Sequence, residues 1–231
     1  MSSADQEKRL AALASLDQVE AGMRVGLGTG STAEHMIRGL AERCKAGLSL
    51  AAVVPTSKAS AELAQNLGLP VSDLERTPNL DVTIDGADEV DPQGHLIKGG
   101  GGALLHEKIV ASASKRFVVI VDSKKMVEQL GKFRVPVEVV QAARPVVAAQ
   151  IERFGGQPTL RLGKDGAPFV TQESNLILDC DFGLISDPPR LAQKLDGITG
   201  VVEHGLFVHL TDVVIIGRGD RAEINTKDRW A

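Results

Sequence analysis

The sequence lacks tyrosine and has few aromatic residues of any kind, which argues against a surface that stacks nucleic-acid bases. Phe and Trp together make up 3% of the 231 residues, and single-strand recognition depends on aromatic side chains. Lys and Arg number 26 against 30 Asp and Glu, so the formal net charge is −4, and no run of basic residues stands out. We therefore expect no nucleic-acid partner, and an anionic ligand would need a local positive site.

Cysteine is also scarce, and histidine does not occur in a metal-binding pattern. The two cysteines, Cys44 and Cys180, are far apart in the sequence, and no Cys-x-x-Cys is present. We expect two buried thiols rather than a disulfide framework. None of the histidines forms a zinc-ligand spacing, so the sequence predicts no metal. The histidines are His35, His95, His106, His204 and His209.

No apolar run approaches the roughly 20 residues that a membrane-spanning helix needs. The first residues, MSSADQEKRLAALASL, mix charges with apolar side chains and contain no signal-peptide core. Hydrophobic residues make up 43% and charged residues 24% of the chain, which is the balance of an ordinary globular protein. We therefore expect a soluble, cytoplasmic protein with no membrane partner.

Short apolar strands alternate with amphipathic helices in the first half of the sequence. Met23–Leu27, Leu50–Val54, Asp81–Asp85 and Phe117–Val121 are strand-like runs, and helical spacing occurs between them. Such alternation is typical of parallel βαβ units with helices on both faces of the sheet. This half predicts an α/β domain with a Rossmann-like, mainly parallel sheet.

The pattern changes near Lys132. From there, strand-like and helix-like segments follow in the order β-α-β-β-α-β, which is that of a ferredoxin-like unit. The apolar run Asp212–Gly217 then resembles the buried strands of the first half. We therefore predict an α/β domain over 1–132 and 208–231, interrupted by a small ferredoxin-like α+β domain over 133–207. The polar tail from Arg218 is predicted to lie on the surface or to fray.

A glycine-rich turn follows the first predicted strand and leads into a helix. In Gly26–Ala33 (GLGTGSTA), glycines let the backbone approach a ligand, and the helix N-terminus offers unpaired N–H groups to an anion. Thr29, Ser31 and Thr32 add hydroxyl donors. The spacing also fits a dinucleotide fingerprint, but no acid ends the next strand to hold a ribose. A compact phosphate site fits better, and a tight turn without a ligand is the alternative.

Acidic residues follow the strand that ends at Asp85. Ligands of an open parallel sheet bind beyond the carboxyl ends of its strands, so Asp85 and Asp88 of DGADEVD are placed to act on one. A solvated acidic loop is the competing interpretation, and it accounts well for Glu89 and Asp91. It accounts less well for Asp85, which ends a buried strand.

Four successive glycines mark a third candidate segment. Lys98–Gly102 leads into an apolar helix, which again predicts an anion cradle, with the positive charge of Lys98 beside it. Glu107 lies early in that helix, where a partly shielded carboxylate can serve as a general base. A flexible loop beside a surface glutamate is the alternative. Past the strand Phe117–Val121, a turn carries Lys124 and Lys125, either of which can bind a phosphate.

The segments GLGTGSTA, PTSKAS, DGADEVD, KGGGGALLHEK, VDSKK and VVEHGLF together resemble the ribose-5-phosphate isomerase type A family, in that family's order from about Gly26 to Gly217. The resemblance implies interconversion of ribose 5-phosphate and ribulose 5-phosphate in the pentose phosphate pathway, without a cofactor, by a homodimer or larger oligomer. It implies Glu107 as the catalytic base and Lys125, rather than Lys124, as a substrate-binding lysine. The other implied substrate-site residues are Thr29, Gly30, Ser31, Thr32, Asp85, Gly86, Ala87, Asp88, Lys98, Gly99, Gly100 and Gly101.

The chemistry of aldose–ketose isomerisation is consistent with these roles. A base must move a proton between C2 and C1 through an enediolate, and donors must stabilise the enediolate oxygens. Glu107 can be the base, Asp85 can handle hydroxyl protons and help open the sugar ring, and Lys98 can hold the developing charge. The candidates for the phosphate end are Ser31, Thr32 and Lys125.

Two other functions stay open at this point. A non-catalytic sugar-phosphate-sensing effector domain would keep the glycine turns without needing Glu107. Such a regulator also needs a DNA-binding module, and the residues before the first strand allow only one helix. A nicotinamide-dependent oxidoreductase would need the missing ribose-binding acid. The expected partner is thus a phosphorylated pentose, with no cofactor.

Overall fold

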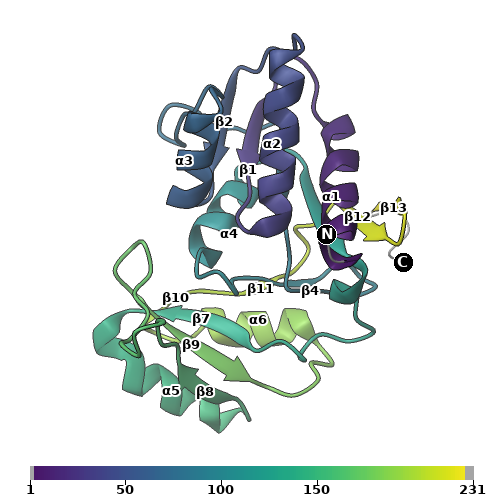
Figure 1. Ribbon diagram of the computed structural model, residues 1–231. Coiled ribbons are helices and arrows are strands. Elements are labelled where there is room, and N and C mark those ends of the chain that lie inside the picture. The colour runs from purple at the N-terminus through teal and green to yellow at the C-terminus, as the bar shows by residue number, and fades with distance from the viewer. Residues whose placement is uncertain (1–2, 227–231) are drawn as a thin grey trace. The chain divides into compact units, whose positions relative to one another are not determined.

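The computed structural model describes residues 3–226, which divide into two compact units (Figure 1). The first unit contains the residues up to Ala87, His106–Met126 and the residues from His209 onward. The second contains Asp88–Leu105 and Val127–Val208, so it takes in two stretches that the sequence analysis assigned to the larger domain. That the units behave as separate domains stays a prediction.

A six-stranded sheet forms the centre of the first unit, in the order β13-β12-β6-β3-β1-β2. Every neighbouring pair is parallel except β12 and β13. The central strands are continuous apolar runs because both faces of a parallel sheet are covered; all six residues of β6 are buried. The bounds are β1 (Arg24–Leu27), β2 (Ala52–Pro55), β3 (Val82–Asp85), β6 (Phe117–Asp122), β12 (Val213–Arg218) and β13 (Arg221–Thr226).

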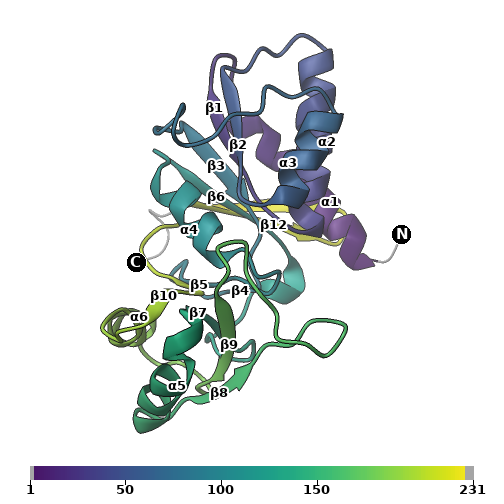
Figure 2. The same ribbon diagram turned by 90° about the vertical axis from the view of Figure 1, so that its left-hand side faces the viewer.

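Helices cover both faces of this sheet (Figure 2). Val25 and Leu27 of β1 belong to the buried cluster that includes side chains of three helices on one face. Gly26 faces the other way, where a Cβ would meet Val110 of the fourth helix. The three helices on the first face are α1 (Ser3–Ser15), α2 (Ser31–Lys45) and α3 (Lys58–Asn66), and the fourth is α4 (Leu104–Ser112).

The segment after Arg218 is a strand, not a frayed tail, as far as Thr226. β13 pairs antiparallel with β12 along its whole length, and Gly219 takes a φ of +62° in the connecting turn. A glycine-containing two-residue turn joining two strands is a hairpin signal, and it was missed because the segment is polar. Trp230 lies outside the described residues.

A four-stranded antiparallel sheet organises the second unit, in the order β10-β7-β9-β8. Two helices accompany it, and the chain order is the predicted β-α-β-β-α-β. The predicted fold class, a mainly parallel α/β sheet with a ferredoxin-like α+β part, is confirmed. The bounds are β7 (Val135–Val139), α5 (Arg144–Arg153), β8 (Gln157–Leu160), β9 (Leu176–Asp181), α6 (Pro188–Asp196) and β10 (Val201–His204).

The second unit also has a small three-stranded sheet that the sequence analysis did not foresee. It consists of β4 (Glu89–Val90), β5 (Leu96–Ile97) and β11 (Leu206–Phe207), in the order β11-β5-β4. The predicted strand Val201–Val208 is divided at Gly205, whose N–H donates to Pro136 O at 2.7 Å and whose carbonyl accepts from Lys98 N–H at 2.8 Å. A Cβ at Gly205 would overlap the carbonyl oxygen of Lys98.

Short 3-10 turns complete the backbone. They are η1 (Leu16–Gln18), η2 (Ser123–Lys125) and η3 (Gln141–Ala143). No helix between residues 3 and 226 has both the length and the apolar character needed to cross a membrane.

Candidate functional site

The turn from β1 into α2 holds the first group of predicted site residues. Gly30 caps α2 with a φ of +99° and has no side chain to bond the first N–H groups of the helix. These groups are therefore available to an anion. Thr29 is anchored by its hydroxyl, which lies 2.7 Å from the hydroxyl of Thr56, and the hydroxyl of Ser60 donates to Gly28 O at 2.6 Å. The PTSKAS segment thus holds the turn in place.

Asp85 is fully buried at the end of β3, and its carboxylate contacts this same turn. Its Oδ1 accepts the Thr29 N–H at 2.9 Å and the Gly86 N–H at 2.7 Å. A Cβ at Gly28 would overlap the carboxylate, so only glycine leaves room for it. The structure brings the two predicted segments together as expected for strand ends at one sheet edge.

A lysine absent from the sequence-based prediction reaches the turn from α1. Nζ of Lys8 donates to Oγ of Ser31 at 3.0 Å, which puts a positive charge beside the uncapped N-terminus of α2. No local motif indicates it, because Lys8 is one polar position on an amphipathic helix 23 residues before Ser31. A cavity of about 360 Å³ between the first turns of α2 and α3 adjoins the same turn, with Gly30 and Ser31 in its lining.

Glu7, next to Lys8, anchors the turn that carries Lys125. Its Oε2 accepts from the N–H (3.0 Å) and hydroxyl (2.7 Å) of Ser123, and its Oε1 accepts from Gly219 N–H at 2.9 Å. The bond from Gly219, followed by those from Ser123, lowers the pKa of Glu7. Lys124 is exposed and Lys125 is half-buried, which accords with the preference for Lys125.

Glu107 lies in the first turn of α4, and its residue is only 6% exposed. A carboxylate at this depth is largely shielded from bulk water, and such a carboxylate can serve as a general base. His106 before it and Lys108 after it also belong to α4. Glu107 belongs to the first unit, together with Thr29, Asp85 and Lys125.

Gly86 and Ala87 also belong to the first unit, whereas Asp88 and the predicted loop Lys98–Gly101 belong to the second, where Asp88 holds the glycine loop. Its Oδ2 accepts the N–H of Gly100 at 2.8 Å, and a Cβ at Gly100 would press against that carboxylate. Gly99 has a φ of +98° and Gly102 one of +82°, conformations that favour glycine. The loop is therefore a defined structure, not the flexible segment weighed as an alternative.

Lys98 begins this loop and is only 2% exposed. Its Nζ lies 5.5 Å from the ring centroid of Phe207, a distance typical of a cation–π contact. Arg161, which no sequence pattern indicated, donates from Nη1 to Gly99 O at 2.8 Å while its guanidinium pairs with Asp179. Arg161, which directly follows β8, thus holds the glycine loop in place.

Two further acids of DGADEVD are buried besides Asp85, which contradicts the solvated-loop interpretation for them. Glu89 is 4% and Asp91 5% exposed. Glu89 accepts the backbone N–H groups of Gly131 (2.8 Å) and Phe133 (2.7 Å). Asp91 accepts the backbone N–H of His95 at 2.8 Å. Both hold backbone in place, so they support the segment rather than contact a ligand.

The side chains of Asp196, Glu203 and His204 lie close enough together to be considered as ligands of one metal ion. Nδ1 of His204 accepts the N–H of Leu206 at 3.2 Å, which places the ring proton on Nε2. Nε2 then donates to Oδ1 of Asp196 at 3.0 Å. Both ring nitrogens are engaged, so this histidine has no lone pair directed at an ion.

Comparison with known proteins gives consistent matches over almost the whole chain. The family model described as ribose 5-phosphate isomerase A (phosphoriboisomerase A) matches residues 52–221. The ribose-5-phosphate isomerase A of Roseiflexus castenholzii is 51% identical over 215 residues, which cover 92% of each chain. That of Parvibaculum lavamentivorans is 47% identical over 227 residues, covering 96% of this chain and 98% of the relative.

Solved structures agree with these sequence matches. The crystal structure of ribose 5-phosphate isomerase A from Neisseria gonorrhoeae superposes with a TM-score of 0.90 at 42% identity, covering 96% of this chain and 97% of that one. A D-ribose-5-phosphate isomerase in complex with phospho-erythronic acid superposes with a TM-score of 0.94 at 36% identity, covering 96% and 99%.

Proposed function

The chain belongs to the ribose 5-phosphate isomerase A family, and on that premise we propose that it interconverts D-ribose 5-phosphate and D-ribulose 5-phosphate through an enediolate. The observation that carries the proposal is the similarity to proteins of that name over 92% or more of both chains. A purely sensing effector domain would not be expected among relatives that are named as isomerases.

Glu107 is proposed as the base that moves the proton between C2 and C1. Isomerisation needs one group that removes a carbon-bound proton and returns it to the neighbouring carbon. The buried position of Glu107 in α4 supports this role. Asp85 accepts two backbone N–H bonds that hold its carboxylate in one orientation, which suits a group that handles hydroxyl protons and assists ring opening.

Lys98 and the glycine loop are proposed to stabilise the charge that develops on the enediolate oxygens. The ammonium of Lys98 is held against Phe207 with almost no exposure, and a cation in a dry site stabilises a developing anion more strongly than one in water. Gly99 and Gly101 carry backbone N–H groups in the same loop, and Asp88 holds its shape by accepting the N–H of Gly100.

The phosphate end is proposed to bind at the N-terminus of α2. The uncapped N–H groups of that helix, the hydroxyls of Ser31 and Thr32, and the ammonium of Lys8 provide donors of the kind that bind phosphate. Lys125 is proposed as a further point charge. The other residues proposed to contact substrate are Thr29, Gly30, Asp85, Gly86, Ala87, Asp88, Lys98, Gly99, Gly100 and Gly101.

We also propose that the enzyme works in the cytoplasm, as a homodimer or larger oligomer, within the pentose phosphate pathway. The proposed reaction consumes and produces phosphorylated pentoses, and charged sugar phosphates of this kind stay inside the cell's aqueous compartment. Sedimentation analysis of the purified protein would determine the number of subunits.

Purified protein mixed with ribose 5-phosphate is expected to form ketose, and the reaction is expected to proceed unchanged in EDTA. The physical reason is that general acid–base groups and protein cations provide all the proposed steps without a Lewis acid. Ketose appearance is followed with and without chelator. Activity that disappears in EDTA and returns with a divalent ion would contradict this mechanism, and no ketose at all would contradict the function.

A further inference from the structure

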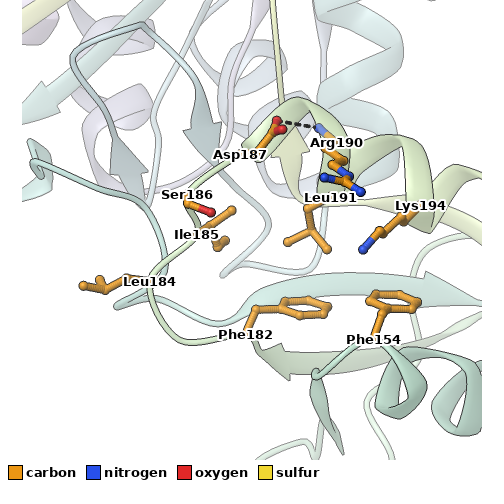
Figure 3. A pocket seen from close by; sticks show the side chains of 9 residues that line it. All are labelled: Phe154, Phe182, Leu184, Ile185, Ser186, Asp187, Arg190, Leu191 and Lys194. Atoms are coloured by element: carbon orange, nitrogen blue, oxygen red, sulfur yellow. Dashed lines mark hydrogen bonds between the residues drawn. The ribbon is translucent and has the colours of Figure 1, made fainter.

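A second cavity lies within the second unit, and none of the predicted site residues lines it. Its volume is about 340 Å³, within the range of small-molecule sites. Figure 3 shows the nine side chains that line it, which come from the end of α5, the segment after β9, and α6. None of them has a role in the function proposed above.

Two aromatic rings form the apolar part of this cavity. The rings of Phe154 and Phe182 are parallel within 3° and have centroids 6.0 Å apart. Both residues are only half-buried, and Leu184 beside them is 60% exposed. Apolar surface left in water can still gain from contact with an apolar ligand, at about 25 cal/mol for each Å² covered. Parallel phenyl rings offer faces and edges against which a flat aromatic ring can pack.

Two cations line the same cavity, and one of them stands over a phenyl ring. Arg190 and Lys194 are four residues apart on α6, so they project from the same side of the helix. Nζ of Lys194 lies 5.4 Å from the centroid of Phe154. Figure 3 shows the ends of both side chains directed toward the space above the phenyl rings.

The lining of this cavity carries more positive than negative charge. Asp187 is the one acid in the lining, and its Oδ1 accepts the backbone N–H of Arg190 at 2.9 Å as the cap of α6. Over residues 3–226, neither Arg190 nor Lys194 forms an ion pair. Like charges at this helical spacing repel each other, and a bound anion would relieve that repulsion.

We propose that this cavity binds a small aromatic anion, a planar ring that carries a phosphate or carboxylate group. The ring contacts Phe154 and Phe182, while the anionic group takes two parallel N–H bonds from Arg190 and the charge of Lys194. A sugar phosphate offers the anion without the ring, so this ligand class differs from the proposed substrate. The site is independent of the isomerase function.

The test uses 1-naphthyl phosphate as the probe, titrated calorimetrically into the full chain in the presence of saturating ribose 5-phosphate. The sugar phosphate occupies the candidate substrate site, so any remaining heat reports a different one. We expect saturable binding with 1:1 stoichiometry. Inorganic phosphate and 1-naphthol, which each lack one half of the ligand, are expected to bind at least tenfold more weakly.

Variants then assign the binding to the cavity. Arg190→Gln and Lys194→Gln are each expected to weaken the probe about three- to tenfold, with isomerase activity unchanged. Lys164→Gln is the matched control, because it removes the same charge from an exposed turn of the same unit outside the cavity. Phe182→Leu keeps the apolar character but removes the ring, and it is expected to weaken 1-naphthyl phosphate while leaving inorganic phosphate unchanged.

Several results would overturn the proposal. Absence of binding to the wild type at millimolar probe is one, and equal binding to the wild type, Arg190→Gln and Lys194→Gln is another. Displacement of the probe by ribose 5-phosphate would assign it to the substrate site instead. A folded variant, verified by circular dichroism, is required for each comparison.

Discussion

At the residue scale, Glu7 and Lys8 show how one turn of α1 supports three separate turns of the chain. Glu7 holds the backbone of Ser123 and Gly219, and Lys8 reaches Ser31. These contacts join the first helix to the turn with Lys125 and to the N-terminus of α2. A helix that carries no recognisable motif thus contributes directly to the proposed phosphate end.

Replacing Lys8 tests that contribution. Lys8→Met keeps the length of the side chain but removes the charge, and it is expected to raise KM for ribose 5-phosphate about tenfold or more while kcat changes little. A hydrogen bond to a charged group contributes about 1.5–3 kcal/mol, and one to a non-reacting phosphate acts equally in ground and transition states. Steady-state kinetics provide the measurement. Lys45→Met, on the exposed end of α2, serves as the control; an equal effect there would refute the assignment.

Replacing Glu107 tests the proton transfer. Glu107→Gln keeps the shape but cannot accept a proton, so kcat is expected to fall by a factor of about 10²–10⁴ while substrate affinity survives. In D₂O, the wild type is expected to incorporate deuterium stereospecifically at the reacting carbon, and the variant is not. Near wild-type turnover and exchange in Glu107→Gln would assign the base to another residue, with Asp85 the first to examine.

At the element scale, one carboxylate ties the starts of three neighbouring strands of the parallel sheet together. Asp81, just before β3, accepts from the backbone N–H of Arg24 at the start of β1 and from its guanidinium, all at 3.0 Å. Lys115, just before β6, donates to the same carboxylate at 2.8 Å. Hydrogen bonds from Arg24, then from Lys115, hold the pKa of Asp81 well below its usual range.

Asp81→Asn is therefore expected to lower the free energy of unfolding at pH 7 by about 1–2 kcal/mol. The ion pair with Lys115 adds little to this value, because Lys115 is mostly exposed and solvent screens the pair. A carboxylate whose folded pKa is depressed stabilises the fold above its unfolded pKa of about 3.9, and that contribution fades as pH falls toward the folded value. Urea unfolding at a series of pH values should show the two proteins converging below about pH 4. Glu42→Gln, an exposed ion-paired control on α2, should differ little from wild type throughout.

Periodicity predicted the long elements well and the short ones poorly. The apolar runs that became β1, β3, β6 and β12 stand out because buried parallel strands need no polar alternation. β4, β5 and β11 have two residues each, too few for any period to appear. The sequence does not predict β13 because its mixture of polar and apolar residues is equally typical of an irregular surface segment. Only the pairing with β12 identifies this segment as a strand.

The sequence predicts those residues of the candidate site that belong to a local backbone motif. It does not predict side chains that reach the candidate site from distant parts of the chain. Thr29, Asp85 and Gly100 lie in glycine-rich or acidic strand-end segments, whose composition already indicates ligand contact. Lys8 and Arg161 reach their loops across 23 and 62 residues of sequence. Such contacts depend on tertiary packing, which local spacing does not encode.

For the whole molecule, we expect the two units to open with different free energies. The first unit has a six-stranded sheet covered by helices on both faces, whereas the second has small antiparallel sheets. Amide hydrogen exchange followed by mass spectrometry should show slower exchange in β6 and β12 than in β8, whose residues are all partly or fully exposed. Uniform exchange of all strands in a single cooperative step would argue against two domains.

The position of β12 between β6 and β13 has a consequence for the newly made chain. Val213 follows Asp122 by 91 residues (213 − 122), so the ribosome needs about 5 to 20 seconds to produce the partner strand after β6 is made. Until then, one edge of β6 and the apolar side of α1 that packs beside β12 lack their partner. The intervening residues 127–208 are synthesised in that interval and include both helices and all four strands of the ferredoxin-like sheet. During this interval the nascent first unit exposes an unpaired strand edge. Protection by a chaperone would matter most for this protein at that stage.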